Sequence, residues 1–193
     1  MRLNIRKGKR PNIELNVSRV ESSIWRNLEF DKHHYLTNEL NKSAKCLLFT
    51  WEQNPVAFVA LLNTPNKGLP HDISISRMVV LPQFQGLGIS SQIMNFCGGI
   101  VKNQGEDYRL LIKTIHEKVG RFLENSNNWK ATSHNGKYRK DLENKNSKKN
   151  LGLARSSFCY VYCGEKISGY EKLLLPINIL REIKYGVQYL NFD

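Results

Sequence analysis

The sequence predicts one α+β domain that begins with antiparallel strands. Short apolar runs rich in β-branched residues recur along the chain, and from its middle onward they alternate with runs of helical apolar spacing. A length of 193 residues is that of one ordinary domain, and a hydrophobic content of 40% is enough to fill its core. No internal repeat or second domain is visible.

The first elements form an antiparallel start. A strand is expected to begin near Ile13, where IELNV alternates apolar and polar residues. Ser22 or Ser23 is the expected cap of a short helix through Trp25 and Leu28. The segment CLLFTWEQNPVAFVALL then contains two apolar strands. The polar residues 52–55 between them predict a hairpin.

Strand and helix alternate in the next part of the chain. The strand ISISRMVVL ends at Pro82, glycines follow, and Ser90–Val101 has helical spacing. YRLLIKTI is the next predicted strand and EKVGRFLENSN the next helix. The polar stretch 129–150 is predicted to be a loop or a long hairpin, and ARSSFCYVYCG to be a strand that returns to the sheet.

The charge of the chain favours polyanionic partners. The formal net charge is +12 and the pI is near 9.6, which suits nucleic acid, coenzyme phosphates or ribosomal surfaces. Basic residues gather in two arms, residues 2–10 and 137–149. The alternative is that the charge serves solubility alone.

Apolar runs and cysteines indicate the compartment. No run approaches the roughly 18 apolar residues of a membrane span, and no apolar segment follows the basic N-terminus. We therefore expect a cytoplasmic protein without a membrane partner. The four cysteines lie in hydrophobic stretches, which is typical of buried free thiols, and no second Cys or His pair stands at zinc spacing. No metal site is predicted. The cysteines are Cys46, Cys97, Cys159 and Cys163.

A strand that leads into a glycine loop at a helix N-terminus is a candidate phosphate site. Free backbone N–H groups and the positive end of the helix dipole face a ligand there. Gly86 and Gly88 allow close approach of a phosphate or a positive φ angle. Such turns also cap helices for structural reasons alone. A Rossmann dinucleotide loop is discounted, because its third glycine and its acidic residue are not found at the required spacing.

Residues 79–90, VVLPQFQGLGIS, resemble the acyl-CoA signature of the GNAT acyltransferase superfamily, Val-x-Pro followed by Gln/Arg-x-x-Gly-x-Gly/Ala. Ser90 stands where the family usually has Gly or Ala. The resemblance implies a GNAT domain over 12–165, with a mixed, mostly antiparallel sheet, a central splayed parallel pair and flanking helices. A basic leader over 1–11 precedes it, and a C-terminal extension over 166–193 is expected to pack on it.

The same resemblance implies acetyl-CoA or another acyl-CoA as cofactor. Its pantetheine would lie between the strand that ends at Val80 and the strand that ends near Ile115. The residues implied to bind it lie on the first of these strands, the glycine loop and the helix start: Met78, Val79, Val80, Gln85, Gly86, Leu87, Gly88, Ile89, Ser90 and Ser91.

Acyl transfer to an amine needs a base for the amine and an acid for the leaving thiolate. GNAT relatives often use Glu and Tyr, but this chain has Ser74 and Ser76 in the strand before the signature and no tyrosine in the helix after Ile115. Histidines and tyrosines also have structural roles: His33 and His34 could be a solvated pair beside a core Tyr35, and His116 could be exposed or cap a helix. The candidate catalytic residues are His33, His34 and Tyr35, in the region that frames the family's acceptor pocket, and His116.

The His-His-Tyr segment and the signature together look like a branch of the superfamily found in phages and mobile elements. That branch resembles the Mom-type DNA modification proteins. His34-Tyr35 is similar to a His-Tyr pair in those proteins. This kinship implies a base amine as acceptor, reached by base flipping or in single strands, with Trp25, Tyr35 or Trp129 as stacking surfaces or simply as core. Protein amines and small amines are the other acceptors. The competing function is a GNAT-fold nucleic-acid-binding module without transferase activity. No oligomeric state is predicted.

Overall fold

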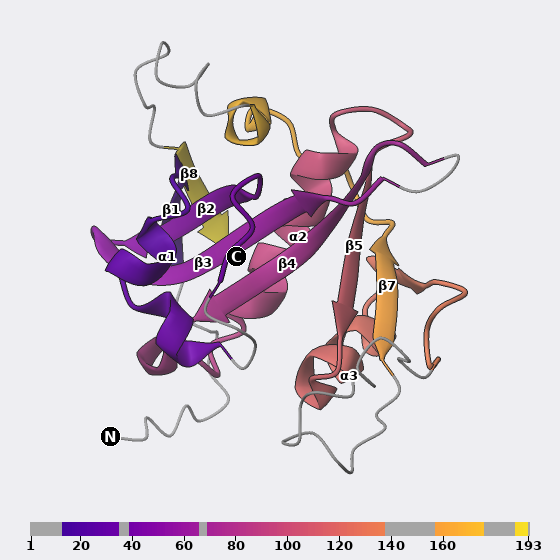
Figure 1. Cartoon of the computed structure of the whole chain (residues 1–193), viewed down its shortest axis with the longest axis horizontal. Coiled ribbons are helices and arrows are strands. Elements are labelled where there is room, and N and C mark those ends of the chain that lie inside the picture. The colour runs from indigo at the N-terminus through magenta and orange to yellow at the C-terminus, as the bar shows by residue number, and fades with distance from the viewer. Residues whose placement is uncertain (1–12, 35–38, 66–68, 138–156, 176–187, 193) are drawn as a thin grey trace.

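The computed structural model (Figure 1) describes residues 13–34, 39–65, 69–137, 157–175 and 188–192. Its helices are α1 (Ile24–Asn27), α2 (Ile89–Lys102) and α3 (Glu117–Asn125), with 3-10 turns η1 (Phe30–His33), η2 (Pro82–Phe84) and η4 (Glu171–Leu174). Its strands are β1 (Ile13–Val20), β2 (Lys45–Trp51), β3 (Asn54–Asn63), β4 (Asp72–Val80), β5 (Arg109–Thr114), β6 (Trp129–Ala131), β7 (Phe158–Tyr162) and β8 (Gln188–Phe192).

The described strands form one eight-stranded sheet in the order β6-β7-β5-β4-β3-β2-β1-β8. Neighbouring strands are antiparallel except for β4 and β5, which are parallel. The predicted α+β class with a mixed, mostly antiparallel sheet is confirmed. Ser23 is the N-cap of α1, as expected, but its side chain makes no capping hydrogen bond.

The hairpin between β2 and β3 is tighter than the sequence predicts. Trp51 pairs with Asn54 and Thr50 with Pro55, so the turn consists of Glu52 and Gln53 alone and not of residues 52–55. Both turn residues have positive φ angles, 47° and 68°. Two such residues suit a two-residue turn whose twist matches that of the strands. Pro55 is tolerated because it lies at the beginning of β3, beside an irregularity in the pairing.

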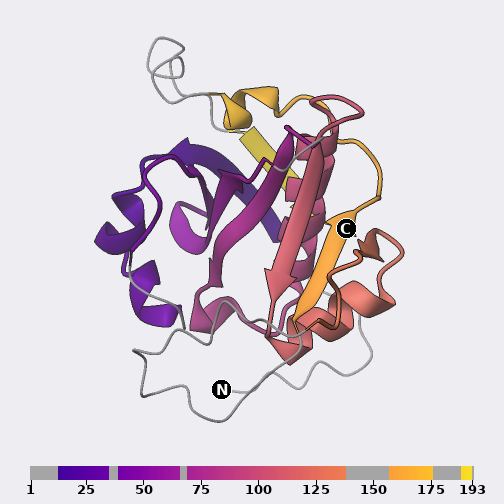
Figure 2. The same cartoon turned by 45° about the vertical axis from the view of Figure 1, so that its right-hand side comes forward.

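The two faces of the sheet carry separate hydrophobic clusters. Helix α2 covers one face, where Ile93 and Ile100 pack with core residues of β1 to β5. Helix α1 and η1 cover part of the other face, where Trp25 and Phe30 pack with Phe58 of β3. Figures 1 and 2 show α1 and α2 on opposite sides of the sheet. A ligand that approaches the middle of the sheet therefore meets different side chains from each side.

A bulge in β4 reverses which side chains face α2. Ala60 pairs with Arg77 and Leu61 with Ile75, so Ser76 is an extra residue in β4. One extra residue shifts the alternation of a strand by one position. After the bulge Val80 faces the α2 cluster, while Arg77 shares its side of the strand with Val79, a member of the Trp25 cluster.

The parallel pair is splayed. β4 pairs with β5 only over Asp72–Ser74 and Arg109–Leu111, although β4 continues to Val80 and β5 to Thr114. Figure 1 shows the two strands diverging toward their C-terminal ends. The implied divergence between a strand ending at Val80 and the next parallel strand is confirmed.

The stretch after α3 begins as a strand. β6 pairs with β7 from Trp129↔Tyr162 to Ala131↔Tyr160, so the long-hairpin interpretation of residues 129–150 is confirmed at its base and the loop interpretation is wrong for 129–131. Trp129 explains the pairing, because it is 5% exposed and anchors this short edge strand in the core. Residues 138–149 and the arm 2–10 lie outside the described residues.

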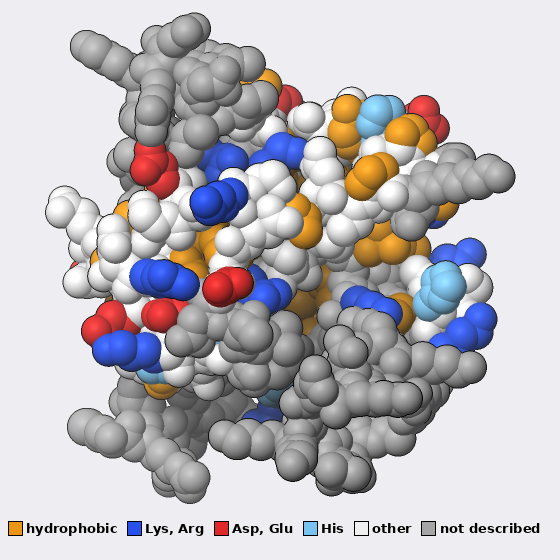
Figure 3. Space-filling view, viewed as in Figure 1, with side chains coloured by type: hydrophobic (Ala, Val, Ile, Leu, Met, Phe, Trp, Pro, Cys, Tyr) orange, Lys and Arg blue, Asp and Glu red, His pale blue; other side chains and the backbone are white. Residues whose placement is uncertain are grey.

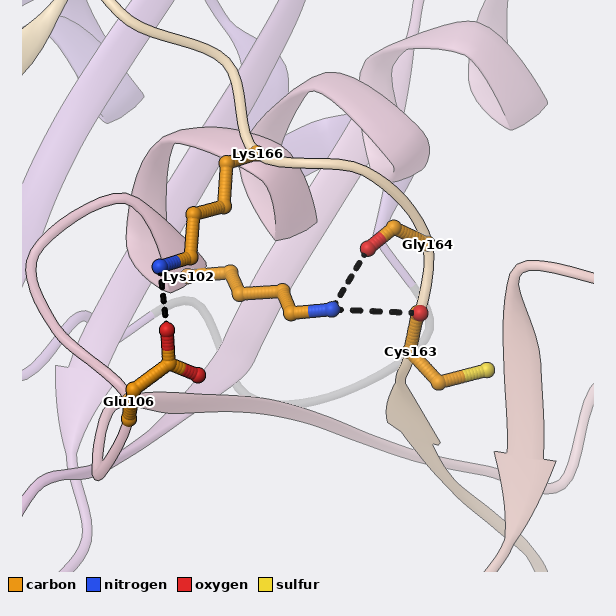
Figure 4. Close-up of polar contacts among 5 residues, drawn as sticks. All are labelled: Lys102, Glu106, Cys163, Gly164 and Lys166. Carbon is orange, nitrogen blue, oxygen red and sulfur yellow. Dashed lines mark hydrogen bonds and ion pairs between the residues drawn. The ribbon is translucent and has the colours of Figure 1, made fainter.

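The segment after β7 lies against the end of α2. The amino group of Lys102 donates to the carbonyl oxygens of Cys163 and Gly164 at 3.3 and 2.7 Å, and Lys166 pairs with Glu106 (Figure 4). Further along, Leu173 and Leu174 are buried in the α2 cluster, and β8 pairs antiparallel with β1.

Three of the four cysteines are buried and free, as predicted. Cys163 is also free, but the predicted burial is wrong for it: it is exposed just beyond the end of β7, where its thiol donates to the carbonyl oxygen of Asn127. No group of three or more metal-ligating side chains is found within the described ranges. None of the helices that the structure describes is long and apolar enough to cross a membrane.

Candidate functional site

The glycine loop connects the diverging end of β4 to α2. Gly86 and Gly88 have φ angles of 85° and 82°, which explains the glycines, since other residues rarely adopt this conformation. Gly88 is the N-cap of α2, and Gln92 donates its amide to the Gly88 carbonyl oxygen at 3.4 Å. The amides of residues 89–91 therefore precede the regular ladder of the helix and are available to an anion.

Several residues of the loop shape it rather than face a ligand. Gln85 donates from its side-chain amide to the carbonyl oxygen of Val80 at 2.8 Å, which ties the loop to β4. Ser91 donates its hydroxyl to the Gly88 carbonyl oxygen at 2.6 Å. Ile89 is 5% exposed and belongs to the core, and Leu87 packs against it. These side chains are thus engaged within the protein, and a phosphate at the loop would meet the backbone of these residues.

Open space surrounds the loop where a ligand needs it. A Cβ atom built on Gly86 meets no heavy atom within 4 Å, and Gly86 is exposed. Of the residues on the preceding strand, Val80 and partly buried Met78 face the α2 cluster, whereas Val79 faces the Trp25 cluster. Figure 3 shows a recess in the surface between β4 and β5, with hydrophobic side chains inside it.

Asp72 and Arg109 hold the closed end of the splay together. The guanidinium donates to both carboxylate oxygens at 2.7 Å, and the carboxylate side chain is only 1% exposed. This contact raises the pKa of Arg109. Because the two residues are opposite partners at the beginning of the parallel pairing, the ion pair joins β4 and β5 at the end where they lie side by side.

His34 lies half-buried on the side of the sheet that α1 covers. Its ring meets that of Trp25 edge-on, with ring centroids 5.7 Å apart. Burial, and secondly the positive charge of Arg77, lower the pKa of His34 from 6.5 to about 4. At neutral pH the imidazole is therefore uncharged, and it can accept a proton but not donate one as an acid.

Arg77 lies near His34, where its charge acts on the imidazole, and it is not among the residues predicted from the sequence. It follows the bulge residue of β4 and donates to the carbonyl oxygens of Ser76 at 2.8 Å and Glu39 at 3.3 Å. The contact with Glu39 joins β4 to the chain that follows η1. A charged residue inside the apolar run ISISRMVV is the signal that could have identified it.

The other predicted catalytic residues are spread over two elements. His33 is exposed at the end of η1, and Tyr35 lies outside the described residues. His116 is the exposed N-cap of α3, where its backbone N–H donates to the Thr114 hydroxyl at 3.0 Å but its side chain makes no capping bond. In Figure 1 α3 lies at the end of β5 toward which the parallel strands diverge.

For Trp25 and Trp129, which were considered either as stacking surfaces or as core residues, the core interpretation is confirmed. Trp25 is 1% exposed and packs on Phe58. Trp129 is 5% exposed and donates its ring N–H to Asn95 at 2.8 Å. Neither has a face available to a base, because neighbouring side chains cover both rings.

Residues 16–120, more than half of the chain, match the family model described as the acetyltransferase (GNAT) family. No curated protein matches the chain by sequence.

Solved structures share the fold at low identity. One is the ribosomal-protein-S18-alanine N-acetyltransferase of Escherichia coli, with a TM-score of 0.54 and 11% identity over 80% of this chain and 96% of that one. Another is Naa50 of Arabidopsis thaliana in complex with a bisubstrate analogue, CoA-Ac-MVNAL, with a TM-score of 0.51 and 13% identity over 77% and 96%. A third is a variant of the spermidine N-acetyltransferase SpeG of Vibrio cholerae, with a TM-score of 0.53 and 12% identity over 76% and 92%.

Proposed function

This chain belongs to the GNAT family of acetyltransferases, and from that premise we propose that it moves an acyl group, first of all acetyl, from acyl-CoA to an amine. The observation that carries the proposal is the splay of β4 and β5 beside a glycine loop at the N-terminus of α2. The loop offers backbone amides to the pyrophosphate. The unpaired strand edges offer backbone groups to the pantetheine amides.

The residues present fit acyl-CoA. The space around Gly86 is open, the loop amides precede the helical ladder, and the recess beside β4 is lined by apolar side chains. Acyl-CoA would supply an activated thioester carbonyl. We assign its binding to the backbone around the loop, to residues 78–80 of β4 and to residues 85–91.

We assign proton removal from the amine to His34, with His116 as the second candidate base. His34 is uncharged at neutral pH, contacts Trp25 and lies near enough to Arg77 of β4 for that charge to lower its pKa. A base with a pKa near 4 is weak, so the amine must reach it largely uncharged. His33 stays a candidate in the same segment, and Tyr35 stays the candidate acid for the thiolate.

We propose the exocyclic amine of a nucleic-acid base as the acceptor. A net charge of +12 supports a polyanionic substrate, and the arms 2–10 and 137–149 are the proposed phosphate contacts. The similarity of His34-Tyr35 to the pair of Mom-type DNA modification proteins of phages supports the same acceptor. The structural neighbours act on a ribosomal-protein alanine and on spermidine, so protein and polyamine amines are the controls.

The test is a transfer assay with radiolabelled acetyl-CoA and four acceptors: single-stranded DNA, RNA, a peptide with a free N-terminus, and spermidine. We expect label on nucleic acid and a loss of roughly 100-fold or more in the rate for His34→Gln, the size of a general-base contribution. Arg26→Gln, on the exposed side of α1, should leave the rate unchanged. Label on peptide or spermidine alone would contradict the proposed acceptor.

A GNAT-fold nucleic-acid-binding module is the second candidate. The absence of the common Glu in β4, where Ser74 and Ser76 donate to the carbonyl oxygens of Leu62 and Ala60, favours it. Such a module would transfer no acetyl group to any acceptor, and its affinity for DNA would fall steeply with salt.

We also propose the layout and compartment of the protein. A leader over 1–11 and an extension over 166–193 flank one domain over 12–165. The burial of Leu173 and Leu174 and the pairing of β8 with β1 support the packing of the extension on the domain. The buried free thiols Cys46, Cys97 and Cys159 support a reducing cytoplasmic location.

A further inference from the structure

Arg77 carries a positive charge that no carboxylate neutralises among the described residues. Its guanidinium contacts two backbone carbonyl oxygens, and its Nε atom is buried without a hydrogen-bond partner. Arginine remains charged at all accessible pH values. By contrast Arg109, in the same sheet, binds both oxygens of Asp72. Arg77 is thus a half-buried cation with unused donor capacity.

The position of Arg77 places this charge on the side from which the amine would come. Arg77 lies on the same side of β4 as Val79, toward Trp25 and Phe30, and its contact with Glu39 lies just beyond η1. The glycine loop, in contrast, leads into α2 on the opposite side of the sheet. The CoA phosphates and Arg77 therefore belong to different parts of the site.

Arg77 also acts on the candidate base. Its charge is the second cause, after burial, of the lowered pKa of His34. An anion bound to the guanidinium would cancel that charge and make His34 a stronger base. The same contact would therefore position the acceptor and activate the group that takes its proton.

We propose that Arg77 binds an oxyanion of the acceptor, a phosphate next to the amine that is acylated. This inference rests on the proposed function and names the group by which the acceptor is recognised. A guanidinium donates two parallel N–H groups to two phosphate oxygens. The strongly basic chain favours a nucleotide phosphate over a carboxylate, which has the same hydrogen-bonding chemistry.

The test compares ligands that differ by one phosphate. Binding of 2′-deoxyadenosine 5′-monophosphate and of 2′-deoxyadenosine is measured by calorimetry for the full chain, Arg77→Gln, Arg77→Lys and the matched control Arg26→Gln, which removes an exposed arginine of α1. We expect the monophosphate to bind roughly tenfold or more tightly than the nucleoside in the wild type and the control. The ratio should fall to about one in Arg77→Gln and be intermediate in Arg77→Lys.

A second readout does not depend on affinity or activity. The ring protons of His34, assigned with His34→Gln, are titrated by NMR with and without inorganic phosphate and the monophosphate. We expect either ligand to raise the pKa of His34 in the wild type and not in Arg77→Gln.

Three results would overturn the inference. One is an equal preference for the monophosphate in the wild type and Arg77→Gln. Another is that the wild type binds alanine more tightly than alaninamide and loses this preference in Arg77→Gln, while it does not prefer the monophosphate to the nucleoside. Arg77 would then bind a carboxylate and not a phosphate. The third is weaker binding of succinyl-CoA, but not of the monophosphate, in Arg77→Gln, which would place the anion on the donor. Binding of acetyl-CoA by all variants shows that they are folded, and its failure in the wild type would contradict the proposed function separately.

Discussion

His34 shows how two physical effects on one side chain decide its chemistry. Burial against Trp25 and the charge of Arg77 both disfavour the imidazolium. The adjacent His33 is exposed. Of the two neighbouring imidazoles, His34 is the half-buried one that contacts the core, and burial lowers its pKa, which is why we assign the proton transfer to it.

The lowered pKa of His34 makes stability depend on pH. The unfolded chain binds this proton near pH 6.5 and the folded chain near pH 4. Between these values the unfolded state holds more protons, so the free energy of unfolding should fall as pH is lowered from 6.5 to 4 and level off below. Urea unfolding across this range checks it for the wild type and His34→Gln. The variant should lose part of the slope, and an identical slope in both proteins would contradict the assigned pKa.

At the scale of elements, the site is formed by strands that part from a fixed point. The Asp72–Arg109 pair closes β4 against β5 at one end. The bulge at Ser76 and the glycine loop then occupy the open end. The geometry of the proposed donor site thus depends on an ion pair remote from the loop.

Arg109→Met should remove the guanidinium charge and its two hydrogen bonds from the buried Asp72 carboxylate. Because that side chain is 1% exposed, we expect a loss of about 3 kcal/mol in the free energy of unfolding, the low end of the range for broken buried pairs since Arg109 itself is partly exposed. Chemical denaturation measures it. Lys32→Met breaks the exposed pair with Glu29 and is the matched control, which should change stability little. Equal effects of the two substitutions would show that the buried pair does not hold the strands.

The packing of α2 against β7 is tested at Gly98. A Cβ atom there would lie 2.3 Å from ring atoms of Tyr162, so Gly98→Ala should cost about 1–3 kcal/mol as overpacking. Tyr162→Leu removes the ring and should cost less in the Gly98→Ala background than alone. A double-mutant cycle from thermal unfolding measures the coupling, and additive effects would contradict the close approach.

At the scale of the whole molecule, features encoded locally could be predicted from sequence and features made by topology could not. The glycine loop, its strand and its helix are contiguous, so spacing identifies them. The bulge leaves one trace in the sequence. The apolar residues that face α2 stand at odd positions before it, Ile73 and Ile75, and at even positions after it, Met78 and Val80.

Contacts between distant segments had no signal of their own. Asp72 and Arg109 are far apart in sequence, and Arg77 meets Glu39 only because β4 lies beside the chain that follows η1. The two-residue turn at Glu52-Gln53 was missed because neither residue favours a positive φ angle. The sequence left β6 undecided between a loop and a hairpin strand, because only Trp129 of its three residues is buried.

The central claim is that the chain binds acyl-CoA on the glycine loop. The most direct test is calorimetric titration of the full chain with acetyl-CoA, repeated with Gly86→Glu and Gly136→Glu. Both glycines are exposed, have positive φ angles and have open space around a Cβ atom, so both variants carry the same strain and charge. We predict binding by the wild type and Gly136→Glu and a loss of at least roughly tenfold in affinity for Gly86→Glu, whose side chain meets the pyrophosphate. Equal affinity of all three proteins, or no binding by the wild type, would contradict the claim.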